Sequence, residues 1–83
     1  MGSVAVVFKI VPEDPAQLSA IHEEVKKIVP MIQKTEEEDI GFGIKALQIS
    51  VVMPDGPGSF ELEEKLNAIT GVSRAEIISV DRL

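Results

Sequence analysis

The side chains that could do chemistry in this chain are few, and most of them are carboxylates. His22 is the only histidine and there is no cysteine, which excludes disulfides, thiolate chemistry and cysteine-ligated metal centres. His22 lies among glutamates in a helical pattern, and no serine–histidine–aspartate set surrounds it in the sequence. The acidic run Glu36-Glu37-Glu38-Asp39 suggests a metal site at first sight. Neighbours in a strand point to opposite faces, so we interpret the run as solvated and expect neither a metal nor a cofactor.

Two other residues suit binding rather than catalysis. Phe42 stands between Gly41 and Gly43 in a chain with only 3 aromatic residues. Flanking glycines allow positive φ angles, so the chain can turn sharply at Phe42. The ring then either folds back to cap the core or stays exposed as an aromatic anchor for a partner. Arg82 is either surface at a fraying strand end or a cation that a free tail delivers to an anionic site.

Composition predicts one domain over residues 1–83 and limits its partners. The net charge is −6, from 14 acidic and 8 basic residues. Nucleic-acid binders normally present a basic surface, so we expect no direct nucleic-acid partner. No apolar run approaches the length of a membrane span, and the start of the chain lacks a signal-peptide pattern. We therefore expect a cytoplasmic protein with no membrane contact.

The first half of the chain predicts a strand, a helix and a second strand. Val4 to Val11 is apolar on both faces, as in a central strand, and Pro12 ends it. Asp14-Pro15 predicts a helix start, with Gln17 completing a capping box. That helix should carry an apolar stripe and a Glu23–Lys27 pair and should end at Pro30; the stripe is Leu18, Ile21, Val25 and Ile28. Met31 to Asp39 reads as a short edge strand that runs into a charged connection.

The second half repeats this alternation. Ile44 to Met53 has an apolar face and predicts a strand, followed by a loop over Pro54 to Gly58. Ser59 is expected to cap a second helix, and Gly71 to stop it. The buried stripe of that helix should be Leu62, Leu66 and Ile69, and Glu61–Lys65 should pair. Val72 to Val80 predicts the last strand, and the blurred alternation at Ile77-Ile78 indicates either a bulge or burial on both faces.

The element order is therefore β-α-β-β-α-β. Right-handed crossovers would place both helices on one face of a four-stranded antiparallel sheet, with the first and third strands central. This is the α+β, ferredoxin-like arrangement. It hosts many functions, so the fold alone does not identify one.

The segment Ile40-Gly41-Phe42-Gly43-Ile44-Lys45-Ala46-Leu47-Gln48-Ile49 resembles the hallmark stretch of the guanine-nucleotide exchange domain of the translation elongation factor 1-beta family. The likeness continues through the Glu-rich second helix to the ending Val80-Asp81-Arg82-Leu83, and the short chain looks like the archaeal form. The resemblance implies a domain without covalent chemistry that binds the GTPase elongation factor 1-alpha and promotes GDP release and GTP loading.

The same resemblance implies which residues contact the partner: Ile40, Gly41, Phe42, Gly43, Lys45, Asp81, Arg82 and Leu83. In the family, the Phe of the Gly-Phe-Gly stretch contacts the G protein, and a basic residue near the carboxyl terminus reaches toward the magnesium site. Eukaryotic members have Lys at that place, whereas this chain has Arg82. The charge is kept, but a planar guanidinium fork replaces a compact ammonium.

Two other classes share the expected topology. A small-molecule-sensing regulatory module would hold its ligand at a loop–helix junction, here the turn Pro12–Pro15. A hydrolase resembling acylphosphatase would need an arginine in the anion-binding loop after the first strand. That loop is Val11-Pro12-Glu13-Asp14 here, which is acidic and repels phosphate, so the hydrolase is the weakest of the three.

Overall fold

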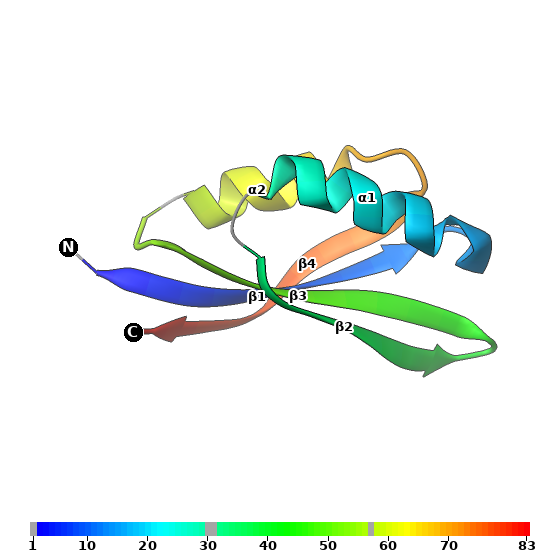
Figure 1. The fold of residues 1–83 in the computed structure, drawn as a ribbon, viewed down its shortest axis with the longest axis horizontal. Helices are drawn as coiled ribbons and strands as arrows, with labels where there is room; N and C mark the ends of the chain where they lie inside the picture. Colours follow the sequence, from blue (N-terminus) through cyan, green and yellow to red (C-terminus); the bar gives the residue numbers. More distant parts are fainter. Residues whose placement is uncertain (1, 30–31, 57) are drawn as a thin grey trace.

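The computed structural model describes residues 2–29, 32–56 and 58–83. The expected helix end at Pro30, strand start at Met31 and loop residue Pro57 lie outside these ranges. The elements are β1 (Ser3–Pro12), the 3₁₀ turn η1 (Pro15–Gln17), α1 (Leu18–Ile28), β2 (Ile32–Gly41), β3 (Ile44–Pro54), α2 (Gly58–Asn67) and β4 (Val72–Arg82). The strands pair antiparallel in the order β2-β3-β1-β4, and both helices cover one face (Figure 1). The ferredoxin-like prediction is confirmed, with β1 and β3 central.

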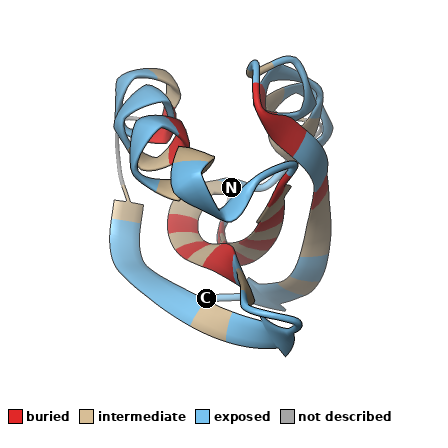
Figure 2. Ribbon diagram, turned by 90° about the vertical axis from the view of Figure 1, so that its right-hand side faces the viewer, coloured by how far each residue is buried: buried red, intermediate tan, exposed pale blue. Residues whose placement is uncertain are grey.

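The core lies between the two helices and the central strands. From Val4 to Pro12, β1 alternates between buried and half-buried residues, because one face of the strand lies under the helices. The predicted α1 stripe is confirmed, with Ile21 and Val25 buried and Leu18 and Ile28 packed at its margin. Figure 2 shows the buried residues on the central strands, at the start of β4 and on the helix sides that face the sheet. The largest fully buried side chains include Phe8, Ile10, Ile21, Leu47, Ile49 and Leu66.

The start of the first helix differs from the prediction. Asp14 does accept a hydrogen bond from the Ala16 N–H at 2.9 Å, but the segment that it caps is η1 rather than α1. The capping box is wrong, because the Gln17 side-chain oxygen is buried without a hydrogen-bond partner among the described residues. Gln17 instead packs beneath Gly71, where an added Cβ would lie 3.1 Å from its side-chain amide.

The helix-surface ion pairs also differ from those predicted. On α1 the lysines pair at a spacing of three residues, Lys26 with Glu23 at 3.6 Å and Lys27 with Glu24 at 3.5 Å, so the Glu23–Lys27 pair is wrong. Residues three and four apart are both neighbours on a helix, so exposed side chains can form either ion pair with little difference in free energy. The predicted pair on α2, Glu61 with Lys65, is not among the ion pairs of the described residues.

The bounds of α2 correct two predictions and support a third. The helix starts at Gly58, so Ser59 lies in its first turn rather than at its cap. It ends at Asn67, four residues before Gly71, so Gly71 is not its stop signal. The predicted stripe is confirmed, because Leu66 is fully buried and Leu62 and Ile69 pack against the core.

Gly71 serves the turn into β4 instead. It has a φ of +95°, and its carbonyl accepts a hydrogen bond from the Glu13 N–H at 2.8 Å. An L-residue is unfavourable in this conformation by roughly 1–2 kcal/mol. The glycine therefore lets the α2–β4 turn approach the β1–η1 turn closely.

Gly71→Ala is expected to lower the free energy of unfolding by about 1–2 kcal/mol, because alanine resists the positive φ. Urea denaturation followed by circular dichroism measures this change. Gly2→Ala is the matched control, since a Cβ at Gly2 would meet nothing within 4 Å and no positive φ is recorded there. An unchanged midpoint for Gly71→Ala would contradict the assignment of strain to this turn.

The edge strands are longer than the sequence patterns predict. β2 continues through the acidic run to Gly41, so the expected charged connection is part of the strand. Backbone pairing of Glu36, Glu37 and Glu38 with β3 outweighs the low strand propensity of glutamate. In β4 the bulge alternative is confirmed, since Phe8 pairs with Ile77 and Val7 with Ser79, which leaves Ile78 as the extra residue.

Candidate partner-binding surfaces

The β2–β3 hairpin is closed by a two-residue turn that holds Phe42. Gly41 pairs with Ile44, so Phe42 and Gly43 are the two central residues. The φ angles are +99° at Gly41, +56° at Phe42 and +74° at Gly43. Positive φ at both central positions is the pattern of a type I′ turn, where Asn-Gly and Gly-Gly are preferred. Phenylalanine at the first position costs on the order of 1 kcal/mol, so this ring is held in an unfavourable backbone conformation.

The Phe42 ring is fully exposed, at 102% of its reference area. The alternative in which it folds back to cap the core is therefore wrong; the exposure is confirmed, and the role as a partner's anchor stays a prediction. Asp39 steadies the turn, because its side-chain oxygen accepts a hydrogen bond from the Gly41 N–H at 3.0 Å. An exposed aromatic ring on a hydrogen-bonded turn loses little freedom on binding, which suits it to anchor a partner.

The other predicted hairpin residues lie at the same end of the molecule. Ile40 is partly exposed, and a register shift beside it interrupts the pairing between Asp39 and Gly41. Lys45 lies opposite Asp39 in the register and forms an exposed ion pair with Glu37 at 3.9 Å. The structure thus brings Ile40, Gly41, Phe42, Gly43 and Lys45 into one surface, which we call the hairpin end.

The carboxyl-terminal residues form a second surface. The Leu83 N–H donates to the Ser3 carbonyl at 3.0 Å, so the chain stays paired with β1 to its end. The expected fraying and the expected free tail are therefore wrong, whereas the surface position of Arg82 is confirmed and its role at an anionic site stays a prediction. The Arg82 side chain is 84% exposed and lies 3.8 Å from the Asp55 carboxylate, while Asp81 accepts a 3.4 Å hydrogen bond from the Ser79 hydroxyl. We call Asp55 and Asp81–Leu83 the terminal end.

The two ends lie on opposite sides of the molecule. β3 starts at the hairpin and β4 ends at the termini, and both are antiparallel to β1, so they run in the same direction. Figure 1 shows the β2–β3 turn and the two termini at the two extremes of the long axis, which measures 41 Å. The predicted site residues therefore form two separate surfaces rather than one.

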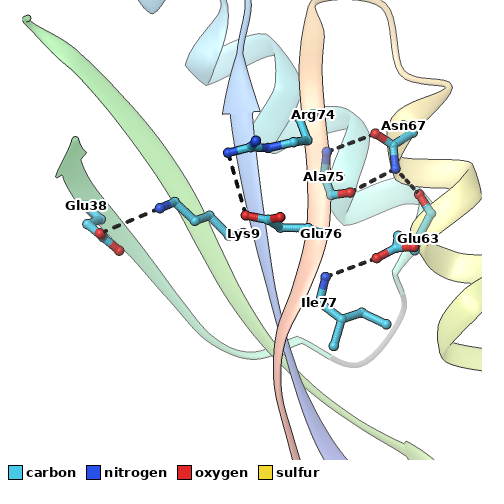
Figure 3. A network of polar contacts seen from close by, with 8 residues as sticks. All are labelled: Lys9, Glu38, Glu63, Asn67, Arg74, Ala75, Glu76 and Ile77. Atoms are coloured by element: carbon cyan, nitrogen blue, oxygen red, sulfur yellow. Dashed lines mark hydrogen bonds and ion pairs between the residues drawn. The ribbon is translucent and has the colours of Figure 1, made fainter. Parts of the chain in front are cut away.

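The acidic side chains of β2 form ion pairs and a hydrogen bond on the protein surface. Lys34 lies 2.6 Å from Glu36, whose hydrogen bond and negative charge raise the pKa of Lys34. Glu38 lies 3.9 Å from Lys9 of β1 (Figure 3) and accepts a hydrogen bond from Gln48 of β3. Within residues 2–29, 32–56 and 58–83, no three acidic or histidine side chains gather as metal ligands would.

Sequence reasoning missed the side chains of α2 that cover the edge of β4. The Asn67 amide bonds both backbone groups of Ala75 at 2.9 Å, donating to the carbonyl and accepting from the N–H. One turn earlier, the Glu63 carboxylate accepts a hydrogen bond from the Ile77 N–H at 3.0 Å (Figure 3). The spacing of four residues between Glu63 and Asn67 fits a helix face, but it does not say that the face meets a strand edge.

An open hollow of about 590 Å³ lies between α1 and α2. It is lined by Glu24, Ile28, Lys65, Ala68, Ile69 and Thr70. The loop–helix turn Pro12–Pro15, the junction expected for a small-molecule sensor, contributes no residue to it.

Comparison with known proteins gives a consistent result. The chain matches the EF-1 guanine nucleotide exchange domain family over residues 5–83. It is 48% identical to elongation factor 1-beta of Methanosphaerula palustris over 79 residues, which cover 93% of each chain. It is 42% identical to elongation factor 1-beta of Sulfolobus acidocaldarius, with 96% of each chain covered.

A solved structure is similar in fold alone. The ACT domain from GTP pyrophosphokinase of Chlorobium tepidum superposes with a TM-score of 0.69 at 16% identity, covering 92% of this chain and 99% of that one. Among the described residues, no helix is long and apolar enough to span a membrane.

Proposed function

Because the chain belongs to the EF-1 guanine nucleotide exchange domain family, we propose that it binds the GTPase elongation factor 1-alpha and promotes GDP release and GTP loading during protein synthesis. Residues 1–83 act as one exchange domain in this proposal. The observation that carries it is the fully exposed Phe42 on its strained turn. Such strain persists where the surrounding structure over-determines it, and it is often found at binding sites.

The proposed exchange needs no covalent step. A factor that binds the nucleotide-free GTPase more tightly than the GDP-bound form weakens GDP binding by the same factor, because the two affinities are linked. The domain must therefore offer contacts that are made fully only when GDP has left. Shape and charge at its two ends can supply such contacts without a nucleophile, a general base or a resident metal.

The two ends have different roles in this proposal. They lie at opposite extremes of a 41 Å axis, so they contact different parts of the GTPase. Phe42 anchors the hairpin end, while Arg82 brings a positive charge to the magnesium and phosphate site. Mg²⁺ requires near-ideal octahedral geometry, so an intruding cation disfavours both the metal and the phosphates that it holds. The exposed Arg82–Asp55 pair is worth little, which leaves Arg82 able to exchange its partner.

The direct experiment measures release of fluorescent GDP from elongation factor 1-alpha after mixing with excess unlabelled GDP. The parent protein is expected to accelerate release in proportion to its concentration until the GTPase is saturated. Absence of acceleration would overturn the proposal. The ACT-domain likeness concerns the fold alone, so the small-molecule-sensing alternative stays an untested prediction, and ligand screening would follow that negative result.

Reversing two charges of the acidic run is expected to slow association with the GTPase. Glu36→Lys with Glu37→Lys should reduce the association rate several-fold at low ionic strength, because local negative charge steers a basic partner surface. The difference in association rate between the parent and the double variant should shrink above about 0.5 M salt, where the Debye length falls below about 5 Å. Stopped-flow mixing measures these rates.

The matched control for that experiment makes the same change of net charge elsewhere. Glu23→Lys with Glu24→Lys alters the exposed face of α1, whose carboxylates pair only with Lys26 and Lys27 among the described residues. Equal slowing by both double variants would assign the effect to net charge. No slowing by the β2 variant would contradict steering by the acidic run.

A further inference from the structure

The outer edge of β4 is protected along only part of its length. The strand order makes β4 an edge strand, and an unpaired edge is a template for another chain. Asn67 of α2 bonds both the N–H and the C=O of Ala75, and Glu63 accepts a hydrogen bond from the Ile77 N–H (Figure 3). Beyond Ile77 the bulge at Ile78 shifts the register, and the helix contributes no further hydrogen bond to the edge in the described part of the chain.

The hydrogen-bond pattern shows which backbone groups of this remaining segment face outward. In an antiparallel pair, alternate residues direct their N–H and C=O groups toward the partner strand. The backbone N–H of Leu83 points toward β1, because it donates to the Ser3 carbonyl. Because this direction alternates along the strand, the backbone groups of Asp81 and Ser79 also face β1. Val80 and Arg82 therefore direct their N–H and C=O groups away from β1. Within residues 2–29, 32–56 and 58–83, no hydrogen bond to those four groups is formed by a side chain or a loop.

Exposed apolar side chains surround these open groups. Val80 is 55% exposed, and Ile78 and Leu83 are exposed as well. On α2, Asn67 lies beside Ala75 and Glu63 beside Ile77, so the helix runs antiparallel to β4. The start of α2 lies near β3 instead, since a Cβ added at Gly58 would lie 3.8 Å from the Met53 side chain. The open edge is therefore flanked by aliphatic side chains.

The opposite edge of the sheet shows a contrasting arrangement. β2 carries four consecutive acidic residues and is exposed along nearly its whole length. Charged side chains on an edge strand prevent pairing with other chains. The segment Ile78–Arg82 has an apolar centre instead, with its charges only at Asp81 and Arg82.

We propose that the segment Ile78–Arg82 pairs with an extended segment of the GTPase, which adds a fifth strand to the sheet beside β4. This inference rests on the proposed function and adds a mode of contact to it. Open N–H and C=O groups two residues apart match the backbone of an extended chain, and the flanking apolar side chains match its alternating side chains. The pairing is continuous with Arg82, so the added strand would fix the direction in which that cation enters the nucleotide site.

A second copy of this chain fits the segment less well. Each copy carries a net charge of −6, so two copies repel each other. An antiparallel pairing of two β4 edges centred on Val80 would also place each Arg82 opposite Ile78 of the other copy, a cation against an apolar side chain. The GTPase supplies an anionic nucleotide site for Arg82 instead.

Amide hydrogen exchange measured by NMR tests the pairing directly. In the free protein, the Val80 and Arg82 amides should exchange rapidly, while the Ser79 and Asp81 amides, bonded to β1, should be protected. In the complex with nucleotide-free elongation factor 1-alpha, the Val80 and Arg82 amides should become protected by at least tenfold. Rapid exchange at both amides in a saturated complex would overturn the proposed pairing while leaving the exchange function intact.

A proline substitution tests the same hydrogen bond through affinity. Val80→Pro removes an N–H that faces away from β1, where proline is tolerated on an edge strand. Val80→Ala removes the apolar side chain and keeps the N–H. We expect Val80→Pro to bind the GTPase about tenfold more weakly than Val80→Ala, as for one lost interface hydrogen bond. Ser79→Pro, which loses an inward bond, should be the variant with lowered thermal stability.

The remaining outcomes separate this inference from the proposed function. Equal affinities of Val80→Pro and Val80→Ala would overturn the strand pairing, provided that both fold as the parent does. Failure of the parent to bind the GTPase would overturn both the function and the pairing. Protection of the Val80 and Arg82 amides without the GTPase, together with a dimeric mass in sedimentation, would overturn the proposed occupant in favour of a second copy.

Discussion

Phe42→Asn is expected to abolish most of the exchange activity while making the free domain more stable. The ring is fully exposed and contributes no core packing, so its loss removes only contacts with a partner. Central aromatic anchors contribute about 2–4 kcal/mol to binding when truncated, which corresponds to roughly 30- to 1,000-fold in affinity. Asparagine also suits the first position of a type I′ turn better than phenylalanine, which should add about 1 kcal/mol to the free energy of unfolding.

Two measurements on the same variant check this prediction. The fluorescent GDP assay should show release close to the spontaneous rate at protein concentrations where the parent is saturating. Urea denaturation should show a higher midpoint with an unchanged slope. Phe42→Leu keeps an apolar side chain without the ring, so it should retain part of the affinity. If Phe42→Asn kept full activity, the hairpin end would not be a contact surface.

Arg82→Ala is expected to slow the maximal rate of GDP release by about 10- to 100-fold when Mg²⁺ is present. The charge of Arg82 acts in the proposal by disfavouring the metal, so its effect should depend on the metal. In excess EDTA the Arg82→Ala variant should therefore release GDP as fast as the parent. Affinity for the nucleotide-free GTPase should fall less than the maximal rate, because the role concerns the metal-bound state.

Matched variants distinguish charge from geometry at the same position. Arg82→Lys keeps the positive charge and should recover most of the rate, whereas loss equal to that of Arg82→Ala would show that the guanidinium fork is required. Asp55→Asn removes the partner of Arg82, and the free energy of unfolding should change little because the pair is exposed. A rate defect of Arg82→Ala that persists in EDTA would contradict a role at the magnesium site.

The two predictions concern opposite ends of one rigid sheet. Phe42 follows β2 and Arg82 ends β4, and the central strands β1 and β3 connect the two ends through continuous antiparallel pairing. A GTPase that contacts both ends is therefore held at two places whose separation the sheet determines. Double variants at Phe42 and Arg82 should show nearly additive free-energy changes, because the two residues lie too far apart to contact each other or the same group of the GTPase.

The sequence by itself determined the fold class and the identity of the hairpin turn. Alternating apolar residues in β1 and β3 and the helical stripe of α1 follow from local periodicity, which reports the buried face of each element. Glycines on both sides of Phe42 likewise specify the sharp turn, since positive φ is a property of the residues themselves. The break in the alternation at Ile77-Ile78 left a bulge or burial on both faces open, and the pairing with β1 shows the bulge.

The tertiary structure alone decided what surrounds these elements. Whether Phe42 folds back or stays exposed depends on the space around the hairpin, and whether the chain end is free depends on a hydrogen bond from Leu83 to a residue eighty positions earlier. The acidic run joins β2 because β3 pairs with it, against its local propensity. Asn67 and Glu63 bond the β4 edge at Ala75 and Ile77, and Ile78–Arg82 stays open. These outcomes depend on contacts between distant segments, and such contacts leave no periodic pattern in the sequence.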